Sequence, residues 1–125
     1  YNGHPMILNA GLTTIGILEH EFDGLLKRTE RLKNGIRDIY AAHGIHILTP
    51  GLGSMFNIAV TELSDIKTYR DLQKSDFALR KKLDYALLLE GIYNKPCNRY
   101  NMCTAHTDEV IDFTLEAYEK AFKRI

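Results

Sequence analysis

The feature that most constrains the fold is a long amphipathic segment, residues 21–43, that is followed by a glycine. Its apolar side chains recur at intervals of three, four or seven residues, at Phe22, Leu25, Leu32, Ile36 and Ile39. Charged side chains occupy the opposite face of this segment. Gly44 follows directly and suits the left-handed position at which many helices end. The spacing therefore predicts a helix that covers a core with one face.

Three further helices are expected, and they cover residues 5–20, 76–90 and 107–124. Gly11 and Gly16 weaken the first of these, each by roughly 1 kcal/mol relative to alanine, so we expect this helix to pack closely against another element. Ser75 or Asp76 can cap the second helix, and Thr107 can cap the last.

Four short strands are expected, at residues 45–49, 54–61, 92–96 and 99–104. Residues 50–53, Pro-Gly-Leu-Gly, are typical of a turn and would join the first two strands in a hairpin. Phe56, Ile58 and Val60 alternate with other residues, which predicts one buried face. Residues 62–74 are polar and irregular. The expected fold class is α+β, a small and mainly antiparallel sheet of about four strands with helices packed on one side.

Composition excludes several classes of protein. The chain has 125 residues, the size of one domain, and its 16 basic residues balance 16 acidic ones, which is unlike a nucleic-acid-binding surface. No apolar run reaches the ~20 residues of a membrane span. Cys97 and Cys103 are expected to be free thiols of a reducing compartment, which favours the cytoplasm. Because the sequence opens with Tyr1 rather than Met, we expect it to continue a longer polypeptide or to have been trimmed.

The residues alone show no catalytic motif. None of the five histidines stands at metal-ligand spacing with another, and the two cysteines lack CxxC spacing, so no metal site is expected. The segment Gly51-Leu52-Gly53 turns between strands and opens no helix, so a phosphate-binding role is disfavoured. Four acidic residues are expected to be solvated members of helices, namely Asp84, Glu90, Asp108 and Glu109.

Arg99 is the candidate binding residue. It stands at the start of an expected strand, between Asn98 and Tyr100, with no acidic residue nearby in the sequence. An arginine can hold a carboxylate with two parallel hydrogen bonds. The alternative is an exposed arginine at the edge of a sheet.

Four segments in register resemble class III aminotransferases. They are Tyr1-Asn2-Gly3-His4-Pro5, Gly51-Leu52-Gly53-Ser54-Met55-Phe56, Leu88-Leu89-Glu90-Gly91-Ile92-Tyr93, and the tail Thr104-Ala105-His106-Thr107-Asp108-Glu109-Val110-Ile111-Asp112. The tail is similar to that of glutamate-1-semialdehyde aminomutases. The resemblance covers essentially the whole chain. One departure is the stretch from Cys97 to Met102, which is shorter than in the aminomutases and lacks their glutamate, so a related aminotransferase stays open.

This resemblance implies the C-terminal small domain of a pyridoxal-phosphate (PLP) enzyme of fold type I. The lysine that binds the cofactor and the threonine that contacts the cofactor phosphate would precede Tyr1, so the resemblance places no catalytic and no cofactor-binding residue here. None of the nine lysines suits the cofactor: six lie on exposed helix faces, two in a polar loop, and Lys95 precedes Pro96.

The resemblance also implies an organisation for the whole enzyme. Residues 1–20 would be a helix that links to a missing large PLP-binding domain, and residues 21–125 would be one compact domain. That enzyme would be a homodimer acting on a small amino acid, and the small domain would help to close its active site. Arg99 matches the position of an arginine that binds the substrate carboxylate in many of these enzymes. The competing hypothesis is a freestanding α+β binding module without catalysis.

Overall fold

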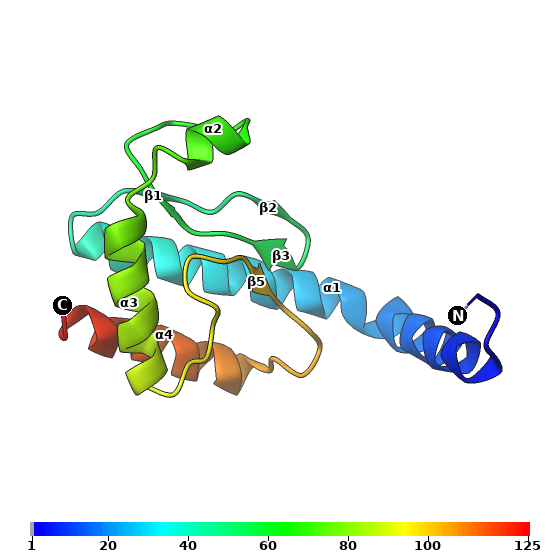
Figure 1. The fold of residues 1–125 in the computed structure, drawn as a ribbon. Coiled ribbons are helices and arrows are strands. Elements are labelled where there is room, and N and C mark those ends of the chain that lie inside the picture. The colour runs from blue at the N-terminus through cyan, green and yellow to red at the C-terminus, as the bar shows by residue number, and fades with distance from the viewer. Residues whose placement is uncertain (1) are drawn as a thin grey trace.

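The computed structural model describes residues 2–125, which form four helices and five strands of two residues each (Figure 1). The helices are α1 (Pro5–Ala42), α2 (Tyr69–Leu72), α3 (Phe77–Leu89) and α4 (Asp108–Phe122). The strands are β1 (Ile47–Leu48), β2 (Gly51–Leu52), β3 (Met55–Phe56), β4 (Ala59–Val60) and β5 (Tyr100–Asn101). The α+β class and the antiparallel pairing of the strands are confirmed.

The first two expected helices are a single helix of 38 residues, so the predicted break near residue 20 is wrong. The reason lies in the spacing of the apolar residues. Ile15, Leu18, Phe22 and Leu25 follow one another at intervals of three and four, so the apolar stripe crosses residue 20 without a change of phase. The helix ends where predicted, because Gly44 takes a φ of 71° and lies just beyond the end.

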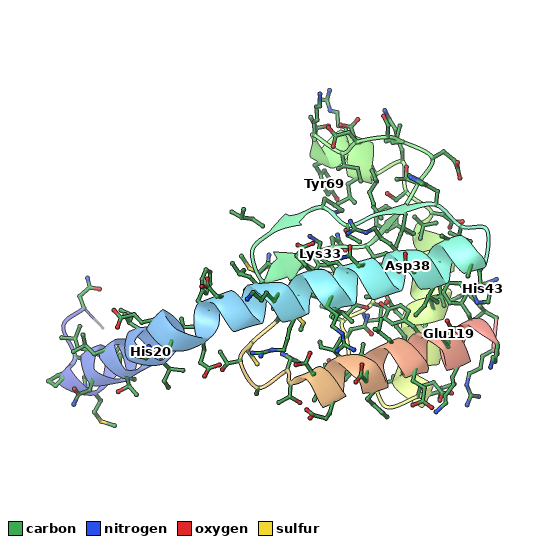
Figure 2. All side chains as sticks on the ribbon, turned by 180° about the vertical axis from the view of Figure 1, so that it is seen from behind. His20, Lys33, Asp38, His43, Tyr69 and Glu119 are labelled. Carbon is green, nitrogen blue, oxygen red and sulfur yellow. The ribbon has the colours of Figure 1, made fainter. Side chains whose placement is uncertain are left out.

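The two halves of α1 have different surroundings. From Leu25 onwards its apolar stripe is buried, whereas almost every residue from Pro5 to Asp23 is exposed. Figure 2 shows His20 on the part of α1 that extends away from the packed layers, and His43 at the opposite end beside the end of α4. The His43 ring stacks on the Phe122 ring at 4.2 Å there. An added Cβ at Gly11 or Gly16 would meet no atom of residues 2–125 within 4 Å, so the expected close packing of these glycines is not found.

The strands form two small sheets instead of the expected one. β1 pairs with β4, while β3 lies between β2 and β5. The expected strand over residues 54–61 is interrupted at Asn57, whose side chain accepts a hydrogen bond from the Ile58 N–H at 2.9 Å. Such a local bond competes with a strand ladder. The hairpin turn moves to Gly53, which has a φ of 59°, because Gly51 and Leu52 belong to β2.

Two other expectations about local structure fail. The strand expected at residues 92–96 is absent, because the Ile92 N–H donates to the Leu87 carbonyl at 2.9 Å and completes the end of α3. The irregular loop contains a short helix, α2, that the pattern missed. Its signal is a capping box, in which the Thr68 side chain and the Asp71 side chain each accept from the other's backbone N–H.

The core lies between the second half of α1, α3, α4 and the strands. α4 runs beside α1, and α3 crosses α4 (Figure 1). The expected inward residues Phe56, Ile58 and Val60 are buried, which confirms the predicted face. Asp76 caps α3 by accepting from the Leu79 N–H at 2.9 Å. Within residues 2–125, no helix combines the length and the apolar composition that crossing a membrane requires.

Candidate functional site

Arg99 lies just before β5, where the chain returns to the hairpin formed by β2 and β3. Its side chain is exposed, and no carboxylate of residues 2–125 forms an ion pair with it. Its backbone N–H donates to the Asn98 side chain at 2.9 Å. The guanidinium therefore keeps its donors available for a group from outside this part of the chain.

Arg99 forms part of the wall between two cavities. One, of about 270 Å³, is lined otherwise by the β2–β3 hairpin and its flanks, residues 50–52 and 55–57. The other, of about 290 Å³, lies between the segment 92–106 and helices α1 and α4. Its lining includes Lys95, Arg99 and His106 but no aspartate or glutamate. Neither lining contains a carboxylate, so an anion entering either cavity would meet cationic, neutral polar or apolar side chains.

A buried ion pair on α3 supports this region. Arg80 and Asp84 are 2% and 1% exposed, so the expectation that Asp84 is solvated is wrong. The Arg80 Nε lies 2.9 Å from Asp84 Oδ1, and its Nη1 donates to the Ile58 carbonyl at 2.7 Å. Burial alone would lower the pKa of Arg80, but Tyr100, Tyr118 and Asp84 outweigh it and raise that pKa. The guanidinium is therefore charged in the folded protein.

The ion pair could have been found from the spacing of residues along α3. Arg80 and Asp84 are four residues apart, and both are buried on the same helix as Leu83 and Leu87. A charge on the apolar face needs a partner, and the residue one turn away is the nearest candidate. Sequence reasoning passed over this signal because it treated acidic residues on helices as solvated.

The other three acidic candidates differ in exposure. Asp108 and Glu109 are exposed, as expected, and Asp108 forms an ion pair with Arg31 at 3.1 Å. Glu90 is only partly exposed and pairs with Arg124. Thr107 takes the N-cap position of α4 without a capping bond from its side chain. The Thr107 side chain and the α4 backbone favour the ionised Glu109 carboxylate and lower its pKa.

The remaining candidates do not form a metal site in the part of the chain that the structure describes. Within residues 2–125, no group of three or more His, Cys, Asp or Glu side chains is placed to hold a metal ion. Cys97 and Cys103 are free thiols. Of the lysines expected on exposed helix faces, Lys33 is the exception, because its side chain is 13% exposed and bonds Glu30 at 2.6 Å. Figure 2 shows Lys33 in the second half of α1, where that helix belongs to the packed layers.

Solved structures show the class of protein to which this fold corresponds. The chain superposes on an omega-transaminase from Sphaerobacter thermophilus with a TM-score of 0.81, at 23% identity, over 97% of this chain and 28% of that one. It also superposes on the FumI protein of Sphingopyxis sp. MTA144, whose structure was solved with PLP, with a TM-score of 0.71 at 25% identity, over 92% and 26% of the two chains. The fold is that of the C-terminal region of transaminases. No protein-family model matches the chain.

Sequence comparison gives the more particular relationship. The chain is 35% identical, over its whole length, to glutamate-1-semialdehyde 2,1-aminomutase from Pyrobaculum islandicum. It spans about 30% of the length of the curated relatives that it matches. The chain is therefore homologous to the C-terminal portion of glutamate-1-semialdehyde aminomutases and class III transaminases, which confirms the resemblance found in the sequence.

Proposed function

We propose that this chain is the small C-terminal domain of a PLP-dependent aminotransferase or aminomutase, and that Arg99 binds the carboxylate of its amino-acid substrate. The observation that carries the proposal is an exposed arginine without an ion-pair partner in residues 2–125, in a chain homologous to these enzymes along its whole length. The similar proteins include a glutamate-1-semialdehyde 2,1-aminomutase and a β-phenylalanine aminotransferase, so a small amino acid is the proposed substrate class.

The position of Arg99 suits a substrate-binding role better than a structural one. The guanidinium of a structural arginine usually donates hydrogen bonds to groups of the same domain, as Arg80 does to Asp84 and to the Ile58 carbonyl. The Arg99 side chain donates no hydrogen bond within residues 2–125, and only its backbone N–H is bonded, to Asn98. The adjoining hairpin presents Leu52, 85% exposed, and Met55, 49% exposed, which would cover an active site once the large domain lies against them.

The described residues do not fit PLP as a covalently bound cofactor. A lysine that carries PLP must be desolvated and free to react. Lys33 is the one lysine with a largely covered side chain among those that form ion pairs, and it is already bonded to Glu30. We therefore assign the cofactor and its lysine to the large domain, and we expect this chain alone to be inactive. The proposal includes a homodimeric enzyme in the cytoplasm.

The exposed half of α1 supports the existence of a covering domain. Seven large apolar side chains between residues 6 and 22 are 46% to 76% exposed, at Met6, Ile7, Leu8, Leu12, Ile15, Ile17 and Phe22. Five of them, all except Met6 and Ile17, share one face of the helix by their spacing, and an exposed apolar face of this kind is typical of a contact with another protein or domain. In the proposed enzyme, residues 1–20 link to the large domain and lie along it, while residues 21–125 form the small domain.

The test is Arg99→Lys in the full-length enzyme. Lysine keeps the charge but loses the two directed hydrogen bonds. We expect kcat/KM for amino-acid substrates to fall by about 1.5–3 kcal/mol of transition-state stabilisation, the range for a charge-assisted hydrogen bond. An amine substrate without a carboxylate should be unaffected.

A matched control is Arg70→Lys, because Arg70 is also exposed and also lacks an ion-pair partner in residues 2–125, but it lies on α2. It should leave both substrates unchanged. Equal losses for the two substrates in Arg99→Lys would assign Arg99 to the edge of the sheet as a structural residue.

A further inference from the structure

The segment that carries Arg99 has little regular structure of its own. Between the end of α3 and β5, residues 90–99 contain no helix and no strand. Cys97 adopts a φ of 58°, which is unfavourable for a residue other than glycine. Such a conformation persists only where surrounding contacts impose it. The contacts that hold this segment therefore determine where Arg99 lies.

Asp84 makes two of these contacts. Its carboxylate accepts from the Asn94 side-chain amide at 2.6 Å and from the Cys97 N–H at 2.7 Å. The second bond reaches the very residue whose backbone is strained. Both oxygens of Asp84 also accept from Arg80 Nε, at 2.9 and 3.0 Å. Each carboxylate oxygen therefore accepts two hydrogen bonds.

Arg80 contacts the residues on either side of Arg99. Its Nη2 donates to the Asn98 carbonyl at 3.3 Å, and its guanidinium lies 5.4 Å from the centre of the Tyr100 ring. The Tyr100 ring also stacks on the Phe56 ring, with 5.2 Å between the ring centres. The Arg99 backbone is thus fixed at both of its neighbours.

We propose that the Arg80–Asp84 ion pair is a positioning unit, which holds the Arg99 backbone so that its guanidinium meets a carboxylate in one orientation. The inference rests on the proposed function of Arg99. A buried ion pair is a weak source of stability, because two apolar residues of similar size often stabilise a fold as well or better. What an apolar pair cannot supply is the set of directed bonds to Asn94, Cys97 and Asn98.

The decisive variant replaces both charges at once, Arg80→Met with Asp84→Leu. Removing one partner would leave a buried charge unpaired and could unfold the domain, whereas the double change keeps the apolar volume and removes the bonds. In this chain, we expect the 15N order parameter of the Arg99 amide to fall from about 0.85 to below about 0.6, while β1 and β4 stay rigid. In the full-length enzyme, kcat/KM for an amino acid should fall roughly ten- to a hundred-fold. A carboxylate-free amine should be processed as before.

Two further variants keep the test decisive. Asn94→Ala removes the bonds of this amide to Asp84 and to the Tyr100 hydroxyl and leaves the ion pair, so it should loosen Arg99 in the same direction if the double variant does not fold. Ile36→Val is the control, because Ile36 is fully buried on α1 and makes no bond to the segment; it should lower stability without changing the Arg99 amide.

The outcomes separate this inference from the proposed function. A rigid Arg99 amide in the double variant and in Asn94→Ala would overturn the positioning role, and so would equal losses for the amino acid and the amine. If the amide loosens but Arg99→Lys leaves the amino-acid substrate unchanged, the proposed function fails and the inference fails with it.

Discussion

Gly51→Ala offers a test of how the hairpin beside Arg99 is built. Gly51 pairs with Phe56 across the β2–β3 ladder. A Cβ at this position would lie 2.5 Å from Phe56 Cα and closer still to the Met55 carbonyl oxygen. Carbon atoms prefer separations of about 3.5–4.0 Å, so the strands would have to move apart by roughly 1 Å. The neighbouring atoms belong to the backbone, so no side-chain rotation can relieve the clash.

The expected loss of stability follows from these contacts. Overpacking a well-packed site costs about 1–3 kcal/mol. Weakening the adjoining ladder hydrogen bonds adds about 1 kcal/mol. We therefore expect the free energy of unfolding to fall by about 2–4 kcal/mol, which is less than the ~5–15 kcal/mol total stability of an ordinary domain. Phe56 also pairs with Tyr100, so the displacement should reach the residue that follows Arg99.

Urea denaturation followed by circular dichroism measures this loss. The matched control is Gly16→Ala on the exposed half of α1, where an added Cβ meets nothing within 4 Å of the described residues. That change should be neutral or should stabilise the helix by up to about 1 kcal/mol. A Gly51→Ala protein as stable as the Gly16→Ala protein would refute the argument that close approach of the backbones requires glycine.

Three further predictions concern the buried tyrosines and α1. In urea denaturation, Tyr40→Phe should leave the free energy of unfolding unchanged or raise it by about 1 kcal/mol, because the buried Tyr40 hydroxyl has no hydrogen-bond partner in residues 2–125. Tyr118→Phe should lower it by about 1 kcal/mol, because this change removes the 2.6 Å bond to the Tyr100 hydroxyl. Burial raises the pKa of Tyr40 and Tyr118 above the ordinary value of 10.0, so only the unfolded chain releases these two protons as the pH passes 10. The free energy of unfolding should therefore fall by roughly 3 kcal/mol per pH unit for the two tyrosines together. Thermal melts at increasing pH measure this, and a stability that rose or stayed level would contradict it. In hydrogen exchange on this chain, amides of residues 8–20 should exchange much faster than those of residues 25–41, and equal protection of the two would contradict the exposure of the first half of α1.

The helices could be predicted because their signals are local. The apolar stripe of α1, the Asp76 cap and the glycine after residue 43 each lie within a turn or two of the feature they determine. The same stripe misled at residue 20, where a boundary was assigned although the interval of three and four continued. A helix boundary needs a change of phase or a breaker, and residues 18–22 contain neither.

The support of the candidate site could not be predicted as readily, because its bonds join distant parts of the sequence. Arg80 bonds Ile58 and Asn98, which are 22 and 18 residues away. The spacing of Arg80 and Asp84 indicates an ion pair, but no local pattern shows which backbone carbonyls complete it. Arg99 itself was chosen from its residue type and from the family resemblance, and its role in binding a carboxylate stays a prediction.

The continuity of α1 bears on where a large domain would lie. Ile15 and Phe22 are spaced in sevens with the buried Thr29 and Ile36, and such a stripe drifts by only about 20° per heptad around a straight helix. The exposed apolar face and the buried one therefore lie on nearly the same side of α1. A cavity of about 380 Å³ joins them, lined by Ile17 and Phe22 from the exposed half and by Ser54 and Met102 from the hairpin and the segment after β5. If a large domain covers the exposed stripe, as we propose, it lies close to Ser54 and Met102, which line this cavity together with α1. Arg99 lines a separate cavity of the same β2–β3 hairpin, and we propose that a carboxylate held between the two domains reaches Arg99 there.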